Sequence, residues 1–228
     1  MKKYKAVLFD FDYTLADSSK AVVECISYSL QKMGYPASTP ESICRTIGLT
    51  LADAFRELTK DASVSNADIF RSYFKERADV VMTKNTRVFD TVGSVLDRLK
   101  KMGLKTGIVS TKFRYRIEDI LKRDGLLHYF DIIIGGEDVS AHKPDPEGVI
   151  KALTELGIAR DNVIFIGDSV VDARTAQNAD VDFAAVLTGT TERDKFLEFD
   201  ARAVLKDLSE LPDFFESGFD CSRFCDMV

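Results

Sequence analysis

Two aspartates near the start of the chain are spaced so that they could do chemistry together. Asp10 and Asp12 follow the short apolar run at residues 6–9, which predicts a buried strand because it is brief, unbroken and rich in strand-forming residues. Alternate side chains of an extended chain project to the same side, so both carboxylates are expected to face one site. Two carboxylates this close repel each other unless a cation or a shared proton compensates. Mg²⁺ is the expected compensation, because it binds protein carboxylates together with phosphate oxygens.

Hydroxyl, lysine and carboxylate side chains recur after the later apolar runs of the chain. In an open parallel sheet, ligands bind beyond the carboxyl ends of the strands, so these side chains are expected to converge on the edge that holds Asp10. They follow the runs at 106–109, 131–134 and 163–166 and are, in chain order, Ser110, Thr111, Lys112, Lys143, Asp168 and Asp172. Together they predict a site for a metal ion and a phosphoryl group.

The chemistry of phosphoryl transfer suggests a role for each group. An aspartate can attack the phosphorus and form an aspartyl-phosphate, and Asp10 is the expected nucleophile. A carboxylic acid must protonate the leaving group and later deprotonate the attacking water, and Asp12 is expected to do both. Donors must also neutralise the phosphoryl oxygens. The remaining expected roles are phosphoryl binding by Ser110, the Thr111 amide and Lys143, metal binding by Asp168, and metal binding or ligand orientation by Asp172.

The order of the predicted elements specifies an α/β fold. Apolar runs that predict strands alternate with segments of helical periodicity from about residue 87 onward. Such alternation specifies a parallel sheet covered by helices on both faces. The runs lie at 6–9, 106–109, 131–134, 163–166 and 183–187, with a weak final one at 203–205. The expected fold is therefore a Rossmann-like, doubly wound parallel sheet.

Residues 17–86 predict only helices, including a short one from Glu41 to about Gly48. The longest of these helices carries an apolar stripe, namely Ile69, Phe70, Tyr73, Phe74, Val80 and Val81. This all-helical stretch has to be an insertion between the first and second strands of the sheet. The predicted organisation is an α/β core domain of residues 1–16 and 87–228 and a helical cap domain of residues 17–86.

Composition excludes several classes of protein. The chain has 228 residues, of which 45% are apolar and 30% charged, as in ordinary globular domains. The net charge of −6 argues against binding nucleic acid through many phosphate contacts. No apolar run approaches the roughly 20 residues that span a bilayer, and the N-terminus lacks the apolar core of a signal peptide. We therefore expect a cytoplasmic protein, monomeric or homodimeric, that binds neither nucleic acid nor a membrane.

The C-terminal tail contains aromatic and thiol side chains with no evident place in the site. The aromatic residues Phe214, Phe215, Phe219 and Phe224 predict a segment docked on the core or a contact between protomers. The four cysteines are expected to be free thiols, because no secretion signal accompanies them. Cys221 and Cys225 have helical spacing, which leaves a metal or redox pair open.

The residues of the expected site also resemble the four motifs of the haloacid dehalogenase superfamily, in the family's order. The matching segments are 10–15, 110–112, 143–146 and 167–172. The resemblance implies a Mg²⁺-dependent phosphatase with a Rossmann-like core and a cap between the first two motifs. It also implies a metal contact from the backbone carbonyl of Asp12. Tyr13 stands where the family usually has glycine, which leaves the backbone geometry of this turn open.

Further details of the resemblance narrow the subfamily. Asp12 argues for phosphate chemistry, because the dehalogenase branch lacks this second aspartate, and Val22 stands where related sugar phosphomutases have a cap histidine. The segment 47–51 resembles the substrate loop of phosphoglycolate phosphatases, and 109–112 resembles their second motif and that of related pyrophosphatases. Residues added to the expected substrate contacts are Thr14, Lys112, Gly48 and Leu49.

The resemblance thus implies a phosphoglycolate phosphatase-like enzyme acting on a small phosphorylated metabolite. Three alternatives stay open from the sequence. These are an inorganic pyrophosphatase, a sugar phosphomutase and a non-catalytic sensor of phosphorylated metabolites.

Overall fold

The structure, a computed structural model, describes residues 4–216. Its internal contacts divide the chain into two compact units. We call Met1–Ala16 with Val88–Val228 the α/β unit, and Asp17–Arg87 the helical unit. The chain passes between them at β2 (Ala16–Asp17) and β3 (Arg87–Val88), which pair with each other in a small sheet of their own. The sequence did not predict these strands, because two residues are too few to show a period.

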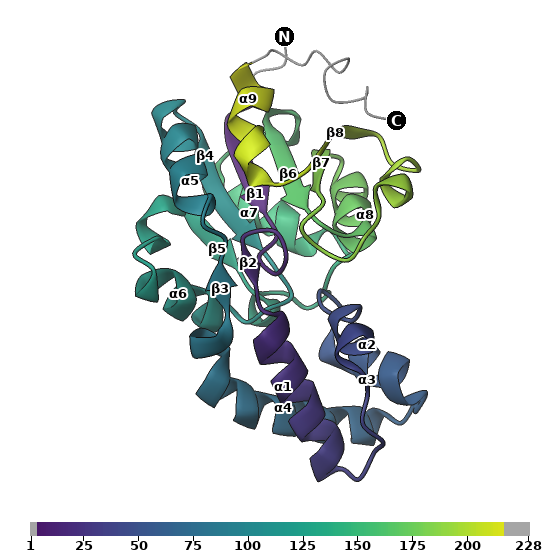
Figure 1. Ribbon diagram of the computed structural model, residues 1–228. Helices are drawn as coiled ribbons and strands as arrows, with labels where there is room; N and C mark the ends of the chain where they lie inside the picture. Colours follow the sequence, from purple (N-terminus) through teal and green to yellow (C-terminus); the bar gives the residue numbers. More distant parts are fainter. Residues whose placement is uncertain (1–3, 217–228) are drawn as a thin grey trace. The chain divides into compact units, whose positions relative to one another are not determined.

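The α/β unit is built on six parallel strands in the order β5–β4–β1–β6–β7–β8. The strands are β1 (Ala6–Phe9), β4 (Lys105–Val109), β5 (Ile132–Ile134), β6 (Val163–Gly167), β7 (Asp182–Val186) and β8 (Ala201–Leu205). From β1 the chain adds β4 and β5 on one side and then returns to add the other three strands on the opposite side (Figure 1). The predicted Rossmann-like sheet is therefore confirmed.

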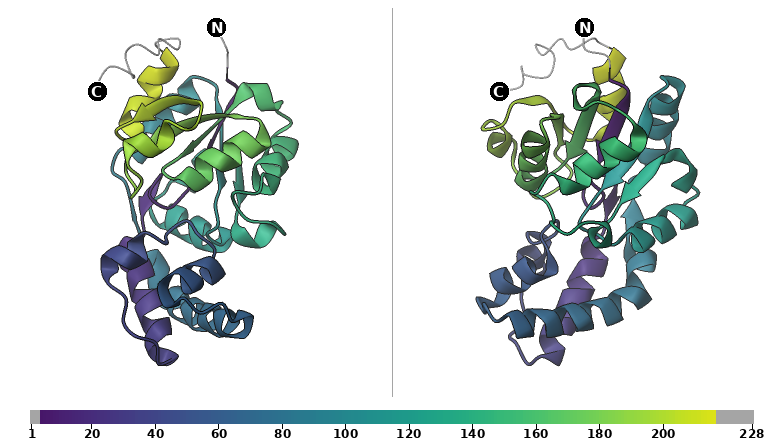
Figure 2. Two further views of the ribbon diagram at one scale, coloured as in Figure 1. Left: turned by 90° about the vertical axis from the view of Figure 1, so that its right-hand side faces the viewer. Right: turned by 180° about the vertical axis from the view of Figure 1, so that it is seen from behind.

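Helices cover both faces of this sheet (Figure 2). One face packs against α5 (Val92–Lys101), α6 (Arg114–Arg123) and α9 (Leu211–Glu216), and the other against α7 (Glu147–Leu156) and α8 (Val170–Ala179). Short 3₁₀ turns lie at Leu127–Tyr129, Gly136–Asp138, Arg160–Asn162, Arg193–Phe196 and Leu208–Glu210. Along β1, Val7 and Phe9 enter one core and Ala6 and Leu8 the other. Because both of its faces are buried, β1 is an unbroken apolar run, Ala6–Phe9.

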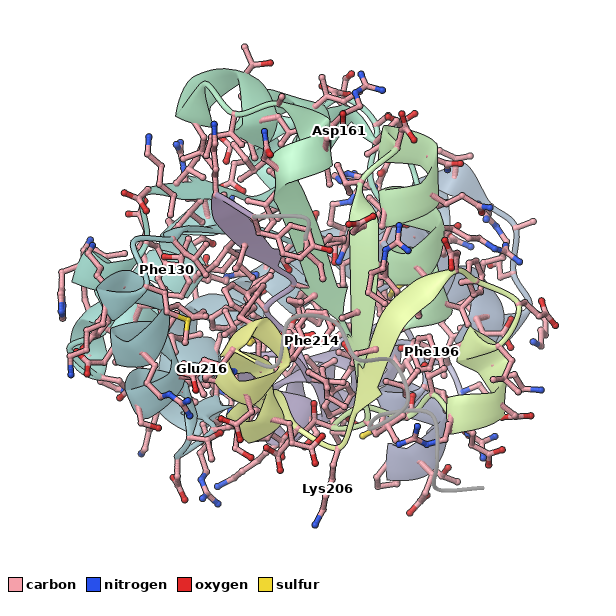
Figure 3. All side chains as sticks on the ribbon, turned by 90° about the horizontal axis from the view of Figure 1, so that it is seen from above. Phe130, Asp161, Phe196, Lys206, Phe214 and Glu216 are labelled. Carbon is pink, nitrogen blue, oxygen red and sulfur yellow. The ribbon has the colours of Figure 1, made fainter. Side chains whose placement is uncertain are left out.

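The beginning of the C-terminal tail is docked on the core. Figure 3 shows Phe214 on α9 beside the strands, and its side chain is buried in the cluster formed by one face of the sheet. Arg98 of α5 pairs with Asp213 and Glu216 of α9, at 2.9 Å in each case. The expected docking therefore holds for this part of the tail. The other residues of the tail prediction, Phe219, Phe224, Cys221 and Cys225, lie outside the described residues.

The helical unit consists of α1 (Ser19–Lys32), α2 (Pro40–Cys44), α3 (Leu51–Thr59) and α4 (Val64–Asn85). Its core holds Ile26, Leu30, Phe55 and Phe70, all at most 1% exposed. Neither Cys25 nor Cys44 of this unit forms a disulfide with another described residue. None of the helices within residues 4–216 combines the length and apolarity of a membrane span.

Two sequence predictions for the helical unit are wrong. The helix expected to reach about Gly48 ends at Cys44, because the N–H groups of Thr46 and Ile47 bond three residues back and Gly48 takes a φ of 95°. Ile69 and Val80 of α4 are 47% and 69% exposed rather than part of the core. The buried stripe of α4 instead includes the small residues Ala67 and Ala78. A pattern based on large apolar side chains does not reveal them.

Candidate active site

Asp10 lies at the carboxyl end of β1, in the middle of the sheet. Phe9 pairs with Ile108 of β4 on one side and with Ile166 of β6 on the other. The backbone N–H of Asp10 donates to the carbonyl of Ile166 at 2.9 Å. This register brings the residues that follow β4 and β6 to the two sides of Asp10. The strand order reverses here, which is where open α/β sheets bind ligands.

Lys143 forms ion pairs with two carboxylates of this edge. Its Nζ lies 2.8 Å from Oδ1 of Asp10 and 2.6 Å from Oδ1 of Asp172, and all three side chains are at most 5% exposed. Burial alone would lower the pKa of Lys143, but the two carboxylates more than offset this effect and hold the pKa above its usual value. Lys143 therefore keeps a fixed positive charge beside Asp10.

The carboxylates of Asp10, Asp168 and Asp172 gather into one acidic cluster, with oxygens that lie within 4.8 Å of one another. Burial raises the pKa of Asp10 to about 6, although the charge of Lys143 opposes this shift. Burial, followed by the charges of Asp172 and Asp10, holds the pKa of Asp168 well above its usual range. The cluster thus carries more negative charge than Lys143 neutralises. Since the possible ligand atoms of the cluster are buried carboxylate oxygens, the cluster fits a hard divalent cation such as Mg²⁺.

Neighbouring groups hold the two carboxylates that follow β6. The hydroxyl of Thr14 donates to Oδ1 of Asp168 at 3.3 Å. Oδ2 of Asp172 accepts from the hydroxyl of Ser169 at 2.5 Å and from its N–H at 3.1 Å, in a capping box at the start of α8. Gly167 provides the space, because a Cβ there would lie 2.4 Å from the Cβ of Asp172. Both carboxylates are therefore held in place by their surroundings.

Asp12 lies at the same edge but belongs to a different ion pair. Nζ of Lys112 is 3.1 Å from Oδ1 of Asp12, and the two side chains are 5% and 9% exposed. The same ammonium lies 5.9 Å from the centre of the Phe11 ring. The structure thus places the charge of Lys112 against Asp12, and the substrate contact expected for Lys112 stays a prediction.

Tyr13 adopts a left-handed backbone with a φ of 59°. This conformation is rare for a bulky residue and is usually taken by glycine. The N–H of Tyr13 donates to the carbonyl of Ala16 at 2.7 Å, and its own carbonyl accepts a hydrogen bond from the hydroxyl of Thr188. The turn that glycine usually makes therefore forms with tyrosine, and the surrounding hydrogen bonds hold it.

Ser110 and Thr111 follow β4 on the other side of Asp10. Ser110 is 6% exposed, and its N–H donates to the carbonyl of Ile134 in β5 at 3.0 Å. Ser110, Thr111 and Lys143 line one small cavity, together with His142, Asp145 and apolar residues. Hydroxyl, amide and ammonium donors are thus close together, as phosphoryl binding requires.

The loop that carries Lys143 is anchored at its two ends. Glu147, at the start of α7, accepts hydrogen bonds from the N–H groups of Ser140 at 3.0 Å and Ala141 at 2.8 Å. These bonds, with one from the Ser140 hydroxyl, lower the pKa of Glu147. Asn178 of α8 donates to the carbonyl of Pro144 at 2.8 Å. The backbone around Lys143 is therefore tied to two helices.

The structure brings most of the sequence-predicted residues together at one edge of the α/β unit. These are Asp10, Asp12, Thr14, Ser110, Thr111, Lys112, Lys143, Asp168 and Asp172. The two expected cap residues, Gly48 and Leu49, lie in the helical unit between α2 and α3. Sequence reasoning missed Glu147, Thr188 and Gly189. The one signal for Thr188 and Gly189 in the sequence is their position shortly after a buried strand, β7.

A family model and a known relative each match most of this chain. The model of the haloacid dehalogenase-like hydrolase family matches residues 7–186. A protein of Caldanaerobacter subterraneus assigned as the pyrophosphatase PpaX is 34% identical over 185 residues, which cover 81% of this chain and 82% of that protein.

Two solved structures resemble the fold closely. A protein of Bacteroides fragilis assigned as a haloacid dehalogenase-like hydrolase is 43% identical, with a TM-score of 0.90 and coverage of 92% of this chain and 100% of that one. A protein of Lactobacillus plantarum assigned as a phosphoglycolate phosphatase is 26% identical, with a TM-score of 0.82 and coverage of 93% and 100%.

Proposed function

The chain belongs to the family of haloacid dehalogenase-like hydrolases and is a phosphatase of that family, and we propose that it hydrolyses a small phosphorylated metabolite through an aspartyl-phosphate on Asp10. The observation that carries the proposal is the setting of Asp10. Its carboxylate lies at the reversal point of the sheet, 2.8 Å from the ammonium of Lys143 and inside the acidic cluster with Asp168.

The reaction proceeds in two steps on the residues of this edge. A carboxylate oxygen of Asp10 attacks the phosphorus, the bond from phosphorus to the leaving oxygen breaks, and Asp12 gives its proton to that oxygen. Asp12 then takes a proton from water, which attacks the phosphorus, releases inorganic phosphate and restores Asp10. Lys143, Ser110 and the N–H of Thr111 donate to the phosphoryl oxygens in both steps.

Mg²⁺ is the proposed cofactor. Asp10 and Asp168 would hold it, together with the backbone carbonyl of Asp12, as the family resemblance implies. Both oxygens of Asp172 already accept hydrogen bonds or ion pairs, so Asp172 is better placed to orient Lys143 than to act as a main ligand. When bound, the ion neutralises charge on the phosphoryl group.

Two substrates have specific support. The first is a phosphoglycolate-like monoester, favoured by the likeness to the Lactobacillus plantarum protein and by the resemblance of residues 47–51, with Gly48 and Leu49, to a substrate loop. The second is inorganic pyrophosphate, favoured by the relative assigned as a pyrophosphatase. The two differ in their leaving groups, since a monoester releases an alkoxide and pyrophosphate releases the much less basic phosphate.

Phosphate release from a panel of small phosphates, with Mg²⁺ and with EDTA, tests the proposal. The panel contains phosphoglycolate, pyrophosphate, sugar phosphates and nucleotides. We expect release that requires Mg²⁺ and is lost in the Asp10→Asn variant, and the highest kcat/KM identifies the substrate. A folded protein that binds these compounds but releases phosphate from none of them would favour the sensor function. Transfer of the phosphoryl group to a sugar would favour the mutase.

A further inference from the structure

The loop after β7 contacts two separate parts of the site. Thr188 and Gly189 follow β7 almost directly. The hydroxyl of Thr188 donates to the carbonyl of Tyr13, and Gly189 lies against the carboxylate of Asp168. None of the four sequence motifs includes this loop. It nevertheless joins the turn after β1 to the first carboxylate after β6.

Gly189 leaves no room for a side chain beside Asp168. A Cβ built on Gly189 would lie 1.9 Å from Oδ2 and 2.7 Å from Cγ of Asp168, far inside any allowed contact. Gly189 is not among the glycines with positive φ, so its φ does not require glycine. The one thing that Gly189→Ala would change locally is therefore the space that the Asp168 carboxylate occupies.

Thr188 acts on the neighbouring turn. A left-handed backbone at a bulky residue persists only where surrounding contacts hold it, and the bond from Thr188 is one of the bonds that hold Tyr13. Tyr13 lies between Asp12 and Thr14, and the Thr14 hydroxyl donates to the other oxygen of Asp168 at 3.3 Å. Asp168 is thus confined from both sides, by Thr14 at Oδ1 and by Gly189 at Oδ2.

We infer that Thr188 and Gly189 are positioning residues for the metal-binding side of the site. Gly189 sets where the Asp168 carboxylate lies, and Thr188 fixes the turn that presents Asp12 and Thr14. This inference rests on the proposed function, because it requires the acidic cluster to bind a divalent cation. Residues that orient metal ligands change metal affinity by about 10- to 100-fold when they are replaced.

Direct titration of the purified protein with Mn²⁺, followed by electron paramagnetic resonance of the free ion, tests this inference without any substrate. We expect Gly189→Ala to weaken Mn²⁺ binding about tenfold or more, and Thr188→Val to weaken it by a smaller factor. Thr188→Ser keeps the hydroxyl and should bind like the wild type. Gly93→Ala is the matched control, because its Cβ would meet only Leu126 Cδ2, at an ordinary 3.5 Å.

The outcomes distinguish the proposed metal site from the positioning role of Thr188 and Gly189. Wild-type Mn²⁺ binding with equal affinity in Gly189→Ala would overturn the positioning role and leave the proposed function intact. No binding of Mn²⁺ to the wild type would overturn the metal site, and the inference with it. If melting shows that Gly189→Ala does not fold, the Thr188 pair decides, and equal affinities for Thr188→Val and Thr188→Ser would overturn the inference.

Discussion

Charge is unevenly distributed among the buried residues of the site. Asp12 lies beside a lysine of its own, Lys112, whereas Asp10, Asp168 and Asp172 share the single charge of Lys143. Buried charges that are not neutralised cost free energy, which appears here as the raised pKa values of Asp10 and Asp168. The same imbalance that makes the metal-free protein less stable prepares it to bind a cation.

Replacing Asp168 by asparagine should therefore stabilise the metal-free protein at neutral pH. The pKa of Asp168 is raised by folding, so its contribution is favourable below the unfolded pKa of about 4 and is lost as pH rises through the folded pKa. In EDTA, the melting temperature of Asp168→Asn should exceed that of the wild type. The expected difference is about 2–4 °C for each kcal/mol that the substitution adds to the free energy of unfolding. The difference should shrink as the pH falls toward 4.

Melting curves from pH 4 to 8 in EDTA check this expectation. Asp119→Asn, at an exposed aspartate of α6, is the matched control and should leave the melting temperature unchanged. A difference between Asp168→Asn and the wild type that does not vary with pH would show that charge is not its cause.

Lys112→Met distinguishes a residue that positions Asp12 from one that binds substrate. Breaking a buried ion pair by removing one partner costs roughly 3–5 kcal/mol, so the melting temperature should fall by roughly 10 °C. We expect kcat to fall about tenfold or more while KM changes little, because Asp12 loses its fixed orientation. Steady-state kinetics and melting check this, with the exposed Lys122→Met as control. A higher KM with unchanged kcat would instead support the substrate contact that the sequence predicted.

At the level of elements, the sequence predicts those strands that a local run of apolar residues reveals. β1 and β6 are buried on both faces, so each contains four consecutive apolar residues, which Asp10 follows directly and Asp168 follows after Gly167. Such runs could be recognised without knowing their neighbours. The two-residue strands β2 and β3 could not, because their pairing depends on residues about 70 positions apart, a long-range contact that no local period signals.

The same limit applies to the site. Asp10, Asp168 and Lys143 could be identified because each directly follows a recognisable strand or lies in a motif of its own. The partner of Lys112 could not, since its burial against Asp12 follows from the register of β1 and β4. Gly189 carries no chemical group, and only its distance from Asp168 shows its role.

The loop that carries Lys143 gives a prediction at this scale. Glu147→Ala removes the acceptor of the bonds from Ser140 and Ala141, so the loop should become more mobile and Lys143 less well placed. Because small displacements of a binding group cost much of its effect, kcat/KM should fall about tenfold or more. Hydrogen exchange of residues 140–146 should quicken in parallel. Glu155→Ala, on the exposed side of the same helix, should change neither quantity.

At the scale of the whole molecule, the proposed catalytic residues and the expected substrate loop belong to different units of the chain. The acidic cluster, Lys112 and Lys143 lie in the α/β unit. The expected substrate loop, residues 47–51, lies in the helical unit. If the helical unit acts as a cap, changes in its loop should alter the preference among substrates and leave the chemistry of Asp10 intact.

Gly48→Ala tests this division against Gly34→Ala. Both glycines belong to the helical unit and have positive φ, 95° and 75°, with no atom within 4 Å of an added Cβ. Both variants should therefore lose a similar stability, about 1–2 kcal/mol. Only Gly48→Ala should change the ratio of kcat/KM values between phosphoglycolate and pyrophosphate. Equal ratios in the two variants would argue against a substrate contact at Gly48.

Catalysis through Asp10 is tested most directly by trapping the phosphoryl-enzyme. The wild type is mixed with its best substrate and Mg²⁺, quenched in acid during turnover, digested and mapped by mass spectrometry. We expect one phosphoryl group on Asp10, removed by hydroxylamine as an acyl phosphate would be, and absent from Asp10→Asn. A phosphoryl group on another residue would contradict an aspartyl-phosphate on Asp10. Complete turnover of the substrate with no phosphorylated peptide at any time point would contradict it as well.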